Sequence, residues 1–180
     1  MQFPAALAKL IPMPSLDGSR NLIRDAWNLL GGVPGGKLLF SRLVGKMAPY
    51  TGSIDAKVVT LREGHAEVAL ADKKAVRNHL DCVHAIALAN LAEMAGNLAL
   101  AYSLPDDARF IVAGMSIEYT KKARGTITAL SDCPIPRSSK REQFDVPVTM
   151  RNAAGEEVAH AILHSLVGPK RGSHDVTPVN

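Results

Sequence analysis

The stretch from residue 77 to residue 104 is rich in Ala and Leu and free of proline, and it predicts one long buried helix. It also carries four polar side chains: His84, Asn90, Glu93 and Asn97. At about 100° per residue, the last three lie within roughly 60° of one another on one face of the helix. The carboxylate of Glu93 must be paired, protonated or functional, because a buried and unpaired charge is strongly unfavourable. Glu93 is therefore the first candidate for a general base or a nucleophile.

The start of this helix is a second source of chemistry. We place its opening turn at residues 83–86, where the first backbone N–H groups have no partner within the helix and can donate to an anion. The N–H of Ala85, with His84 and Asn78 close by, predicts an oxyanion hole for acyl transfer. His84 and Glu93 are nine residues apart, or about 13 Å along a helix. The two groups cannot meet within one chain, but a second protomer could bring them together.

The residues before the long helix predict two shorter ones. The first runs over 17–30, with Asp17 and Ser19 as candidate caps and glycines after its last residue. The second runs over about 37–48 and ends at Pro49. Trp27, the only tryptophan, is expected to anchor the core rather than to bind a ligand. Together these helices predict an amphipathic cover for the rest of the chain.

Alternating polar and apolar residues predict six strands in three hairpins. These hairpins join 53–60 to 65–70, 109–120 to 125–131 around the turn 121–124, and 143–151 to 156–167 around the turn 152–155. The order β-β-α-β-β-β-β predicts an α+β fold in which a curved antiparallel sheet wraps the long helix, because a flat sheet would cover too little of its circumference. We divide the chain into an N-terminal helical extension (1–48), one domain (49–168) and a polar tail (169–180).

Composition and charge exclude several classes of function. The chain has 180 residues, 47% of them apolar and 21% charged, which is an ordinary globular balance. The net charge of +4 is spread out and gives no indication of nucleic-acid binding. We expect no signal peptide, no membrane span and no metal site. Cys82 and Cys133 lack metal-ligand spacing, and they favour a reducing compartment, which we expect to be the cytoplasm.

The predicted layout resembles the hotdog fold. Asn78, then His84 six residues on, then Glu93 nine residues further, is similar to the pattern of the phenylacetate-type acyl-CoA thioesterases, which carry Asn, His-Gly-Gly and Asp or Glu at these spacings. The resemblance covers residues 50–168, and the segment NHLDCVHAIALANLAE is similar to an uncharacterised branch of hotdog proteins. The sequence differs from the family motif at one place: the family has His-Gly-Gly where this chain has His84-Ala85-Ile86.

The resemblance implies a hydrolase of acyl-CoA or acyl-carrier thioesters. Its site would lie at the interface of a homodimer, or of a dimer of dimers, with the acid Glu93 from one chain and the oxyanion donors near His84 and Ala85 from the other. No cofactor is implied, since CoA is part of the substrate. Five further residues are expected to bind the substrate: Asn90, Asn97, Lys121, Lys122 and Arg124. The last three are basic and could contact the phosphates of CoA.

Simpler roles compete with these assignments. Glu93 could be satisfied by Asn90, Asn97 or a strand amide, His84 could be an ordinary cap, and Asn78 could end the preceding strand. Cys82 is better explained as a small apolar filler than as a nucleophile. The basic cluster could be a solvated turn. Two other functions also remain open: an acyl-binding hotdog protein without turnover, which the lost glycines favour, and a dehydratase that uses His79 with Glu93.

Overall fold

The computed structural model describes residues 20–170, so the expected caps Asp17 and Ser19 and most of the tail lie outside the described residues. Its elements are α1 (Leu22–Leu30), α2 (Gly36–Met47), α3 (Pro49–Gly52), β1 (Lys57–Arg62), β2 (His65–Leu70), the 3₁₀ turn η2 (Lys74–Val76), α4 (Ala85–Ser103), β3 (Ala108–Tyr119), β4 (Ile127–Asp132), β5 (Glu142–Arg151) and β6 (Glu157–Pro169). The α+β fold predicted from the sequence is confirmed, with small shifts at most boundaries.

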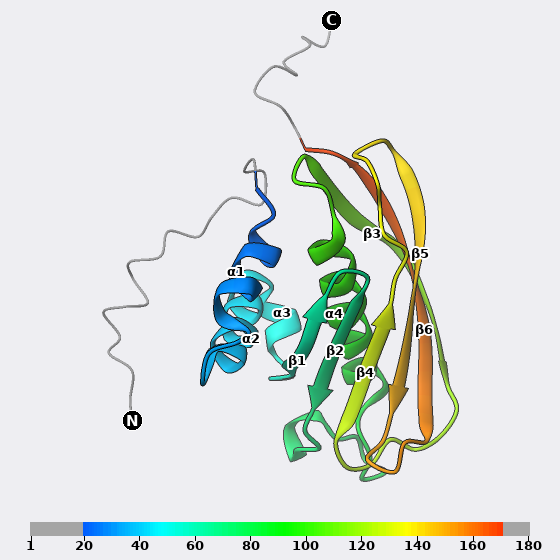
Figure 1. Cartoon of the computed structure of the whole chain (residues 1–180). Coiled ribbons are helices and arrows are strands. Elements are labelled where there is room, and N and C mark those ends of the chain that lie inside the picture. The colour runs from blue at the N-terminus through cyan, green and yellow to red at the C-terminus, as the bar shows by residue number, and fades with distance from the viewer. Residues whose placement is uncertain (1–19, 171–180) are drawn as a thin grey trace, which may run out of the picture.

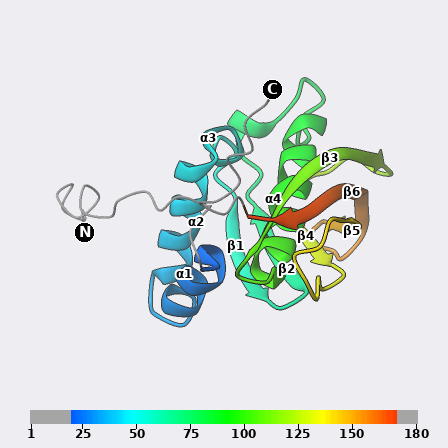
Figure 2. The same ribbon diagram turned by 90° about the horizontal axis from the view of Figure 1, so that it is seen from above.

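One antiparallel sheet wraps around α4, as Figures 1 and 2 show. Its six strands follow the order β1-β2-β4-β5-β6-β3. The helix comes close to the sheet at Gly96, where an added Cβ would lie 3.0 Å from a methyl group of Leu163 and 3.2 Å from methyl groups of Val146 and Val148. A larger residue would not fit at this position. The absence of a side chain at Gly96 therefore lets α4 pack closely against β5 and β6.

The start of α4 lies within the opening turn predicted at residues 83–86. The helix begins at Ala85, so the Ala- and Leu-rich stretch that starts at residue 77 is helical only from there, and it ends at Ser103. Residues 77–84 form a loop instead: Asn78 N–H donates to the Cys82 carbonyl at 2.9 Å, and His84 N–H donates to Val76 at 2.8 Å. Asp81 has a positive φ of 52°, which a helix does not allow. Local hydrogen bonds of this kind compete with helix formation.

The pairing of the third and fourth strands also differs from the prediction. β3 does not form a hairpin with β4; it pairs with β6 at the edge of the sheet, while β4 lies between β2 and β5. The reason is burial, because Ile127 and Ala129 of β4 are fully buried and require a central position, whereas half or more of the residues of β3 remain exposed. The hairpins β1–β2 and β5–β6 are confirmed.

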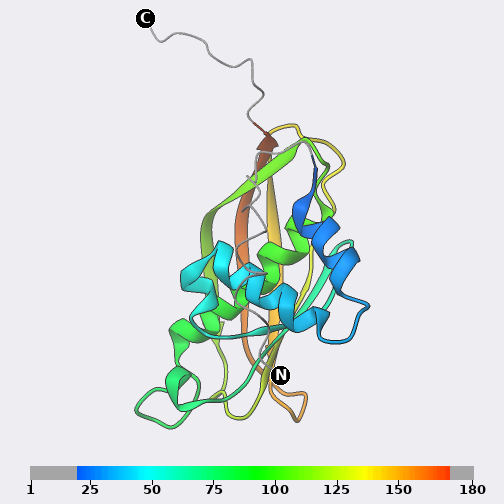
Figure 3. The same cartoon turned by 90° about the vertical axis from the view of Figure 1, so that its left-hand side faces the viewer.

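The three N-terminal helices cover the side of α4 near β1 (Figure 3). Trp27 of α1 is buried and meets Phe40 of α2 edge to face, with 5.1 Å between the ring centroids, so its expected role in the core is confirmed. Asn21 caps α1, and its amide also donates to the carbonyl of Ala101 at 2.7 Å near the end of α4. Pro49 ends α2 as expected, and it also begins the short helix α3, which was not predicted.

Among residues 20–170, α4 is the one helix long and apolar enough to cross a membrane, and most of its residues are buried inside this fold.

Candidate functional site

One stripe of α4 is left open between α3 and β3, which lie on opposite sides of the helix in Figure 2. Ile86 is 55% exposed, and Ala89, Glu93 and Asn97 are partly exposed along the same stripe. Apart from Ala85, Ala101 and Tyr102, the rest of α4 is buried. Glu93 and Asn97, from the face singled out in the sequence, are therefore open to a ligand or a second chain, whereas Asn90 of that face is buried.

Glu93 lies on α4 between two amide side chains whose oxygens lack hydrogen bonds. In the described part of the chain, no ion pair or hydrogen bond involves the Glu93 carboxylate. The Asn90 amide donates to the Tyr50 carbonyl at 3.0 Å, but the side-chain oxygens of Asn90 and Asn97 are buried without a partner. Such oxygens are unfavourable by about 1–3 kcal/mol each. Asn90 and Asn97 thus do not satisfy Glu93, whose carboxylate is left on the open stripe without a partner among the described residues.

The helix start provides the donors. His84 is the N-cap of α4, and its Nδ1 accepts the N–H of Ile86 at 3.0 Å. The proton of a neutral His84 ring therefore lies on Nε2, at the exposed end of the side chain. The N–H of Ala85 has no hydrogen bond within residues 20–170. A 19-residue helix also places the positive end of its dipole here. The Ala85 N–H and the His84 Nε2–H can together bind an oxyanion.

Tyr119, at the end of β3, contributes to this region and was not expected to do so. Its hydroxyl donates to the carbonyl oxygen of Ala85 at 3.0 Å, so it ties the helix start to the edge strand. The side chain is 45% exposed, and partial burial raises the pKa of the Tyr119 phenol. No sequence signal marked it, because the contact depends on the edge position of β3.

Asn78 and Cys82 hold the loop before the helix. The side-chain oxygen of Asn78 accepts the N–H of Leu80 at 2.9 Å and the thiol of Cys82 at 3.4 Å. This arrangement gives Asn78 a structural role beside any catalytic one. Cys82 is buried and free, as is Cys133, whose pKa is raised by burial to about 11. Such a high pKa keeps the Cys133 thiol protonated and unreactive near neutral pH.

The basic segment Lys121–Arg124 lies next to the helix start, because the carbonyl of Ala123 accepts the N–H of Val83 at 2.8 Å. Lys121 forms an ion pair with Glu156 at 2.6 Å, and this contact, with a hydrogen bond from Asn152, lowers the pKa of Glu156. The structure thus gathers His84, Ala85, Asn78, Tyr119 and the basic segment at one end of α4. Glu93 is not among them; it lies eight residues from Ala85, or about 12 Å along the axis.

Two large cavities lie away from these residues. The first, of about 880 Å³, is at the ends of β3, β5 and β6. The second, of about 560 Å³, lies among α2, α3 and β1 and reaches Met94 of α4. Neither is lined by Glu93, His84 or Asn78. Among the described residues, no three His, Cys, Asp or Glu side chains gather as metal ligands.

A second polar constellation lies on the face of the sheet away from α4. His164 Nδ1 lies 2.7 Å from the carboxylate of Asp145, and the hydroxyl of Ser116 lies 3.4 Å from His164 Nε2. These are the groups of a nucleophilic triad, but the serine contact is long for proton transfer. None of the three residues lines either large cavity. The cluster is best explained as cross-strand pairing.

Comparison with known structures identifies the fold. A structural-genomics crystal structure, target APC5556, is 32% identical to this chain with a TM-score of 0.70, over 82% of this chain and 98% of the other. A probable thioesterase from Pseudomonas aeruginosa is 17% identical with a TM-score of 0.66, over 76% and 97% of the two chains. A thioesterase from Haemophilus influenzae is 13% identical with a TM-score of 0.63, over 74% and 93%. The chain has the hotdog fold of these thioesterase-family structures.

The family follows from the sequence match. A family model described as a domain of unknown function, DUF4442, matches residues 36–167, and the chain belongs to this family. The match begins at the first residue of α2 and ends in β6, so it includes α2 and α3 together with the sheet and α4. No protein of curated function matches the chain.

Proposed function

We propose that this protein is a thioesterase that hydrolyses the thioester of an acyl-CoA, or of an acyl group on a carrier, at a site shared by two protomers. The observation that carries the proposal is the open stripe of α4, where Glu93 lies between two buried amide oxygens without partners. A substrate or a second chain can reach the partly exposed Glu93 on this stripe. The fold, which is shared with thioesterase-family structures, supports the same reaction.

The exposed edge strand supports a site shared by two protomers. β3 is 12 residues long and pairs with β6 along one side only. Met115 and Tyr119 are 39% and 45% exposed on the side that faces α4. Natural proteins rarely leave such an edge unprotected. Pairing of two β3 strands about a twofold axis would set the two α4 helices antiparallel, with Glu93 of one chain directed toward the helix start of the other.

In this arrangement the chemistry proceeds in two steps. Water attacks the thioester carbonyl carbon while Glu93 accepts one of its protons, and the N–H of Ala85 and the Nε2–H of His84 bind the oxyanion that forms. The carbon–sulfur bond then breaks, and the leaving thiolate takes the proton from Glu93. The products are a carboxylic acid and a thiol, so one water molecule is consumed per turnover. The two free buried cysteines agree with a reducing compartment, for which we propose the cytoplasm.

One observation favours binding without turnover. Ile86, which replaces a glycine of the similar thioesterases, is 55% exposed at the helix start and occupies space beside the proposed oxyanion hole. In that case the same stripe would hold an acyl-CoA or fatty-acyl ligand, and Glu93 would orient it. A dehydratase that uses His79 and Glu93 is the third candidate, and its products would be enoyl or hydroxyacyl thioesters.

The test is thiol release from acyl-CoAs of short, medium and long chains, with wild type and Glu93→Gln. We expect turnover in the wild type, and a loss of about 10²-fold or more in kcat in the variant with acyl-CoA binding retained, because the amide keeps the shape but cannot accept a proton. Glu63→Gln, in the exposed β1–β2 turn, is the control and should leave kcat unchanged. Retained turnover with a shifted Tm in Glu93→Gln would show that Glu93 is structural. Binding without thiol release by the wild type would favour the acyl-binding function, and enoyl or hydroxyacyl products would favour the dehydratase.

A further inference from the structure

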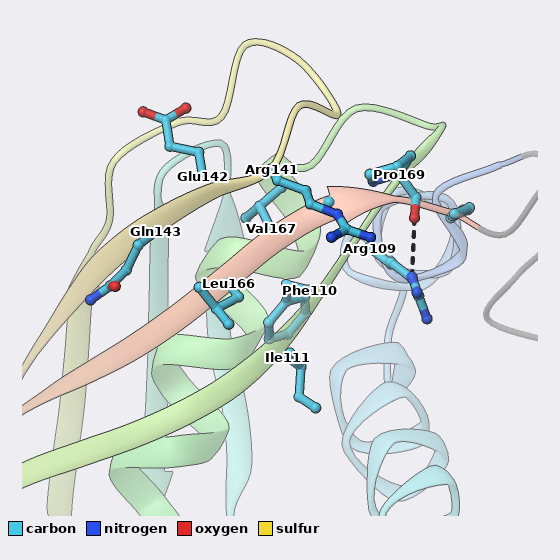
Figure 4. Close-up of a pocket in the computed structure, with 11 residues that line it drawn as sticks. Arg109, Phe110, Ile111, Arg141, Glu142, Gln143, Leu166, Val167 and Pro169 are labelled. Carbon is cyan, nitrogen blue, oxygen red and sulfur yellow. Dashed lines mark hydrogen bonds between the residues drawn. The ribbon is translucent and has the colours of Figure 1, made fainter.

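The face of the sheet that points away from α4 carries a glycine between two arginines. Arg109 of β3 pairs in register with Gly168 of β6. On the other side of Gly168 lies Arg141, just before β5, because a Cβ added to Gly168 would be 3.5 Å from the Arg141 Cγ. The glycine leaves a hollow between the two arginine side chains, which we call the arginine hollow. It forms part of the cavity of about 880 Å³ drawn in Figure 4.

The arginine hollow is positively charged. Neither guanidinium forms an ion pair within residues 20–170; Arg109 Nε donates to the Pro169 carbonyl at 3.1 Å, which leaves its terminal nitrogens for another acceptor. Lys170 at the rim adds a third positive charge, while its ammonium donates to a backbone carbonyl at 3.0 Å. Glu142 is the one carboxylate in the lining, and Figure 4 shows it pointing away from the two guanidinium groups. Arginine side chains on either side of one glycine favour an anion between them.

An apolar strip adjoins the arginine hollow on the same face. Ile111 of β3 and Leu166 of β6 are register partners, two residues from Arg109 and Gly168, and they are 66% and 45% exposed. Both line the cavity, and Figure 4 shows them beside the arginines. Exposed aliphatic side chains adjacent to paired arginines suit a ligand with an anionic head and an aliphatic tail.

We propose that this cavity binds a single-chain alkyl oxyanion, with its carboxylate or phosphate head between Arg109 and Arg141 and its chain along Ile111 and Leu166. The arginines supply planar, bidentate donors for either head group. The strip supplies a surface for several methylenes, and Gly168 supplies the space in which the head lies close to the backbone. This site is separate from the helix start and from Glu93, since none of those residues lines the cavity.

The proposal does not depend on thioester hydrolysis. The site lies on the face away from α4, so pairing of two β3 edges would leave it accessible. A test without any thioester substrate therefore separates the failure of this proposal from the failure of the proposed reaction.

The probes are octanoate, decanoate, decyl phosphate, inorganic phosphate and decyltrimethylammonium, titrated into the full-length protein by calorimetry and by amide NMR. We expect decanoate and decyl phosphate to bind, and affinity to rise by up to about fourfold for each methylene from octanoate to decanoate. Inorganic phosphate alone should bind weakly, and the cationic amphiphile should not compete. Amide shifts should fall on β3 and β6 near Arg109 and Gly168. The ratio of decanoate to decyl phosphate affinity identifies the head group.

Three variants test the geometry. Arg109→Gln and Arg141→Gln should each weaken decanoate binding by about tenfold. Gly168→Val should block the arginine hollow, and the strand should accept it because Gly168 has no positive φ. Arg62→Gln, on β1 at the far edge of the sheet, removes the same charge and should leave binding unchanged. Unchanged decanoate affinity in the double arginine variant, amide shifts confined to α4, or binding to anionic vesicles without binding to decanoate would each overturn the proposal.

Discussion

The phenol of Tyr119 donates a hydrogen bond to the carbonyl oxygen of Ala85, 3.0 Å away, and so joins the end of the edge strand β3 to the first residue of α4. The Ala85 carbonyl and the N–H proposed as an oxyanion donor belong to the two peptide groups on either side of the same Cα atom. A contact that fixes the carbonyl therefore restrains the direction of the N–H. We regard Tyr119 as a positioning residue for the proposed oxyanion hole.

Replacing Tyr119 with Phe should lower kcat by several-fold at constant KM and lower the Tm by about 2–4 °C, because one hydrogen bond is lost and the ring is kept. Tyr102→Phe is a matched control, since the Tyr102 phenol donates to Asn28 at 2.8 Å near the other end of α4. It should lower the Tm alone. Equal effects of the two variants on kcat would give Tyr119 a purely structural role.

The edge of β3 should form the dimer. Sedimentation of the wild type at micromolar concentration should give twice the monomer mass. Met115→Lys places a charge on the edge strand and should shift the protein toward monomer. Ile162→Lys is the control: Ile162 has nearly the same exposure, 38% against 39%, but lies on β6, away from the edge. A monomeric wild type would end the shared-site hypothesis.

The basic segment should act on binding rather than on chemistry. A phosphate contact far from the carbonyl stabilises ground and transition states alike, so Ala at Lys121, Lys122 and Arg124 should raise KM for acyl-CoA and leave kcat nearly unchanged. The effect should shrink at high salt. Within the set, Lys122→Ala should cost more affinity than Lys121→Ala, because Lys121 already pairs with Glu156. An unchanged KM in the triple variant would mean that the segment is a solvated turn with no role in substrate binding.

Asp72 gives the structure a defined acid sensitivity. Its carboxylate accepts Arg77 Nε at 2.7 Å and Gly125 N–H at 2.9 Å, so it joins the loop before α4 to the segment before β4. The hydrogen bond from Arg77, followed by the one from Gly125, lowers the pKa of Asp72. A lowered folded-state pKa adds stability above the unfolded value, near 4, and this stability is lost as the pH falls through the folded value.

Asp72→Asn should therefore lower the Tm by about 2–6 °C at pH 7 and by progressively less below about pH 4. Melting curves from pH 7 to pH 2 measure the difference. Glu63→Gln serves as the reference, since no ion pair involves Glu63 in the described chain. If the difference in Tm between wild type and Asp72→Asn stayed constant with pH, the ionised Asp72 carboxylate would not be the source of the lost stability.

Local patterns predicted the elements of this fold better than their pairing. Pro105, just beyond the last turn, marks the end of α4, and the opening turn predicted at residues 83–86 contains its first residue, Ala85. The composition of the residues before it does not show that Asn78 hydrogen-bonds its own loop. Two strands adjacent in sequence usually form a hairpin, and only burial shows that β3 belongs at the edge.

The candidate site was partly predictable for a similar reason. Glu93 stands out as a carboxylate in an apolar helix. The exposed residues around it are three or four positions apart, which is the spacing of one face of an α-helix. The unpaired oxygens of Asn90 and Asn97 could not be predicted, since they depend on which strand or helix lies opposite. The contact of Tyr119 with Ala85 depends on long-range topology and has no local pattern.

The order of the strands has a consequence for how the chain is made. β3 emerges from the ribosome well before β6, the strand it pairs with in the sheet, and Ser116 meets His164 across 48 positions of sequence. At about 5–20 residues per second, β3 waits roughly 2–10 s with both edges unpaired. During that interval β1, β2 and α4 have already been synthesised and can pack together. β3, however, has no partner strand with which to form backbone hydrogen bonds. Slower translation between residues 120 and 157 should therefore lengthen the time in which β3 is open to chaperones or to aggregation.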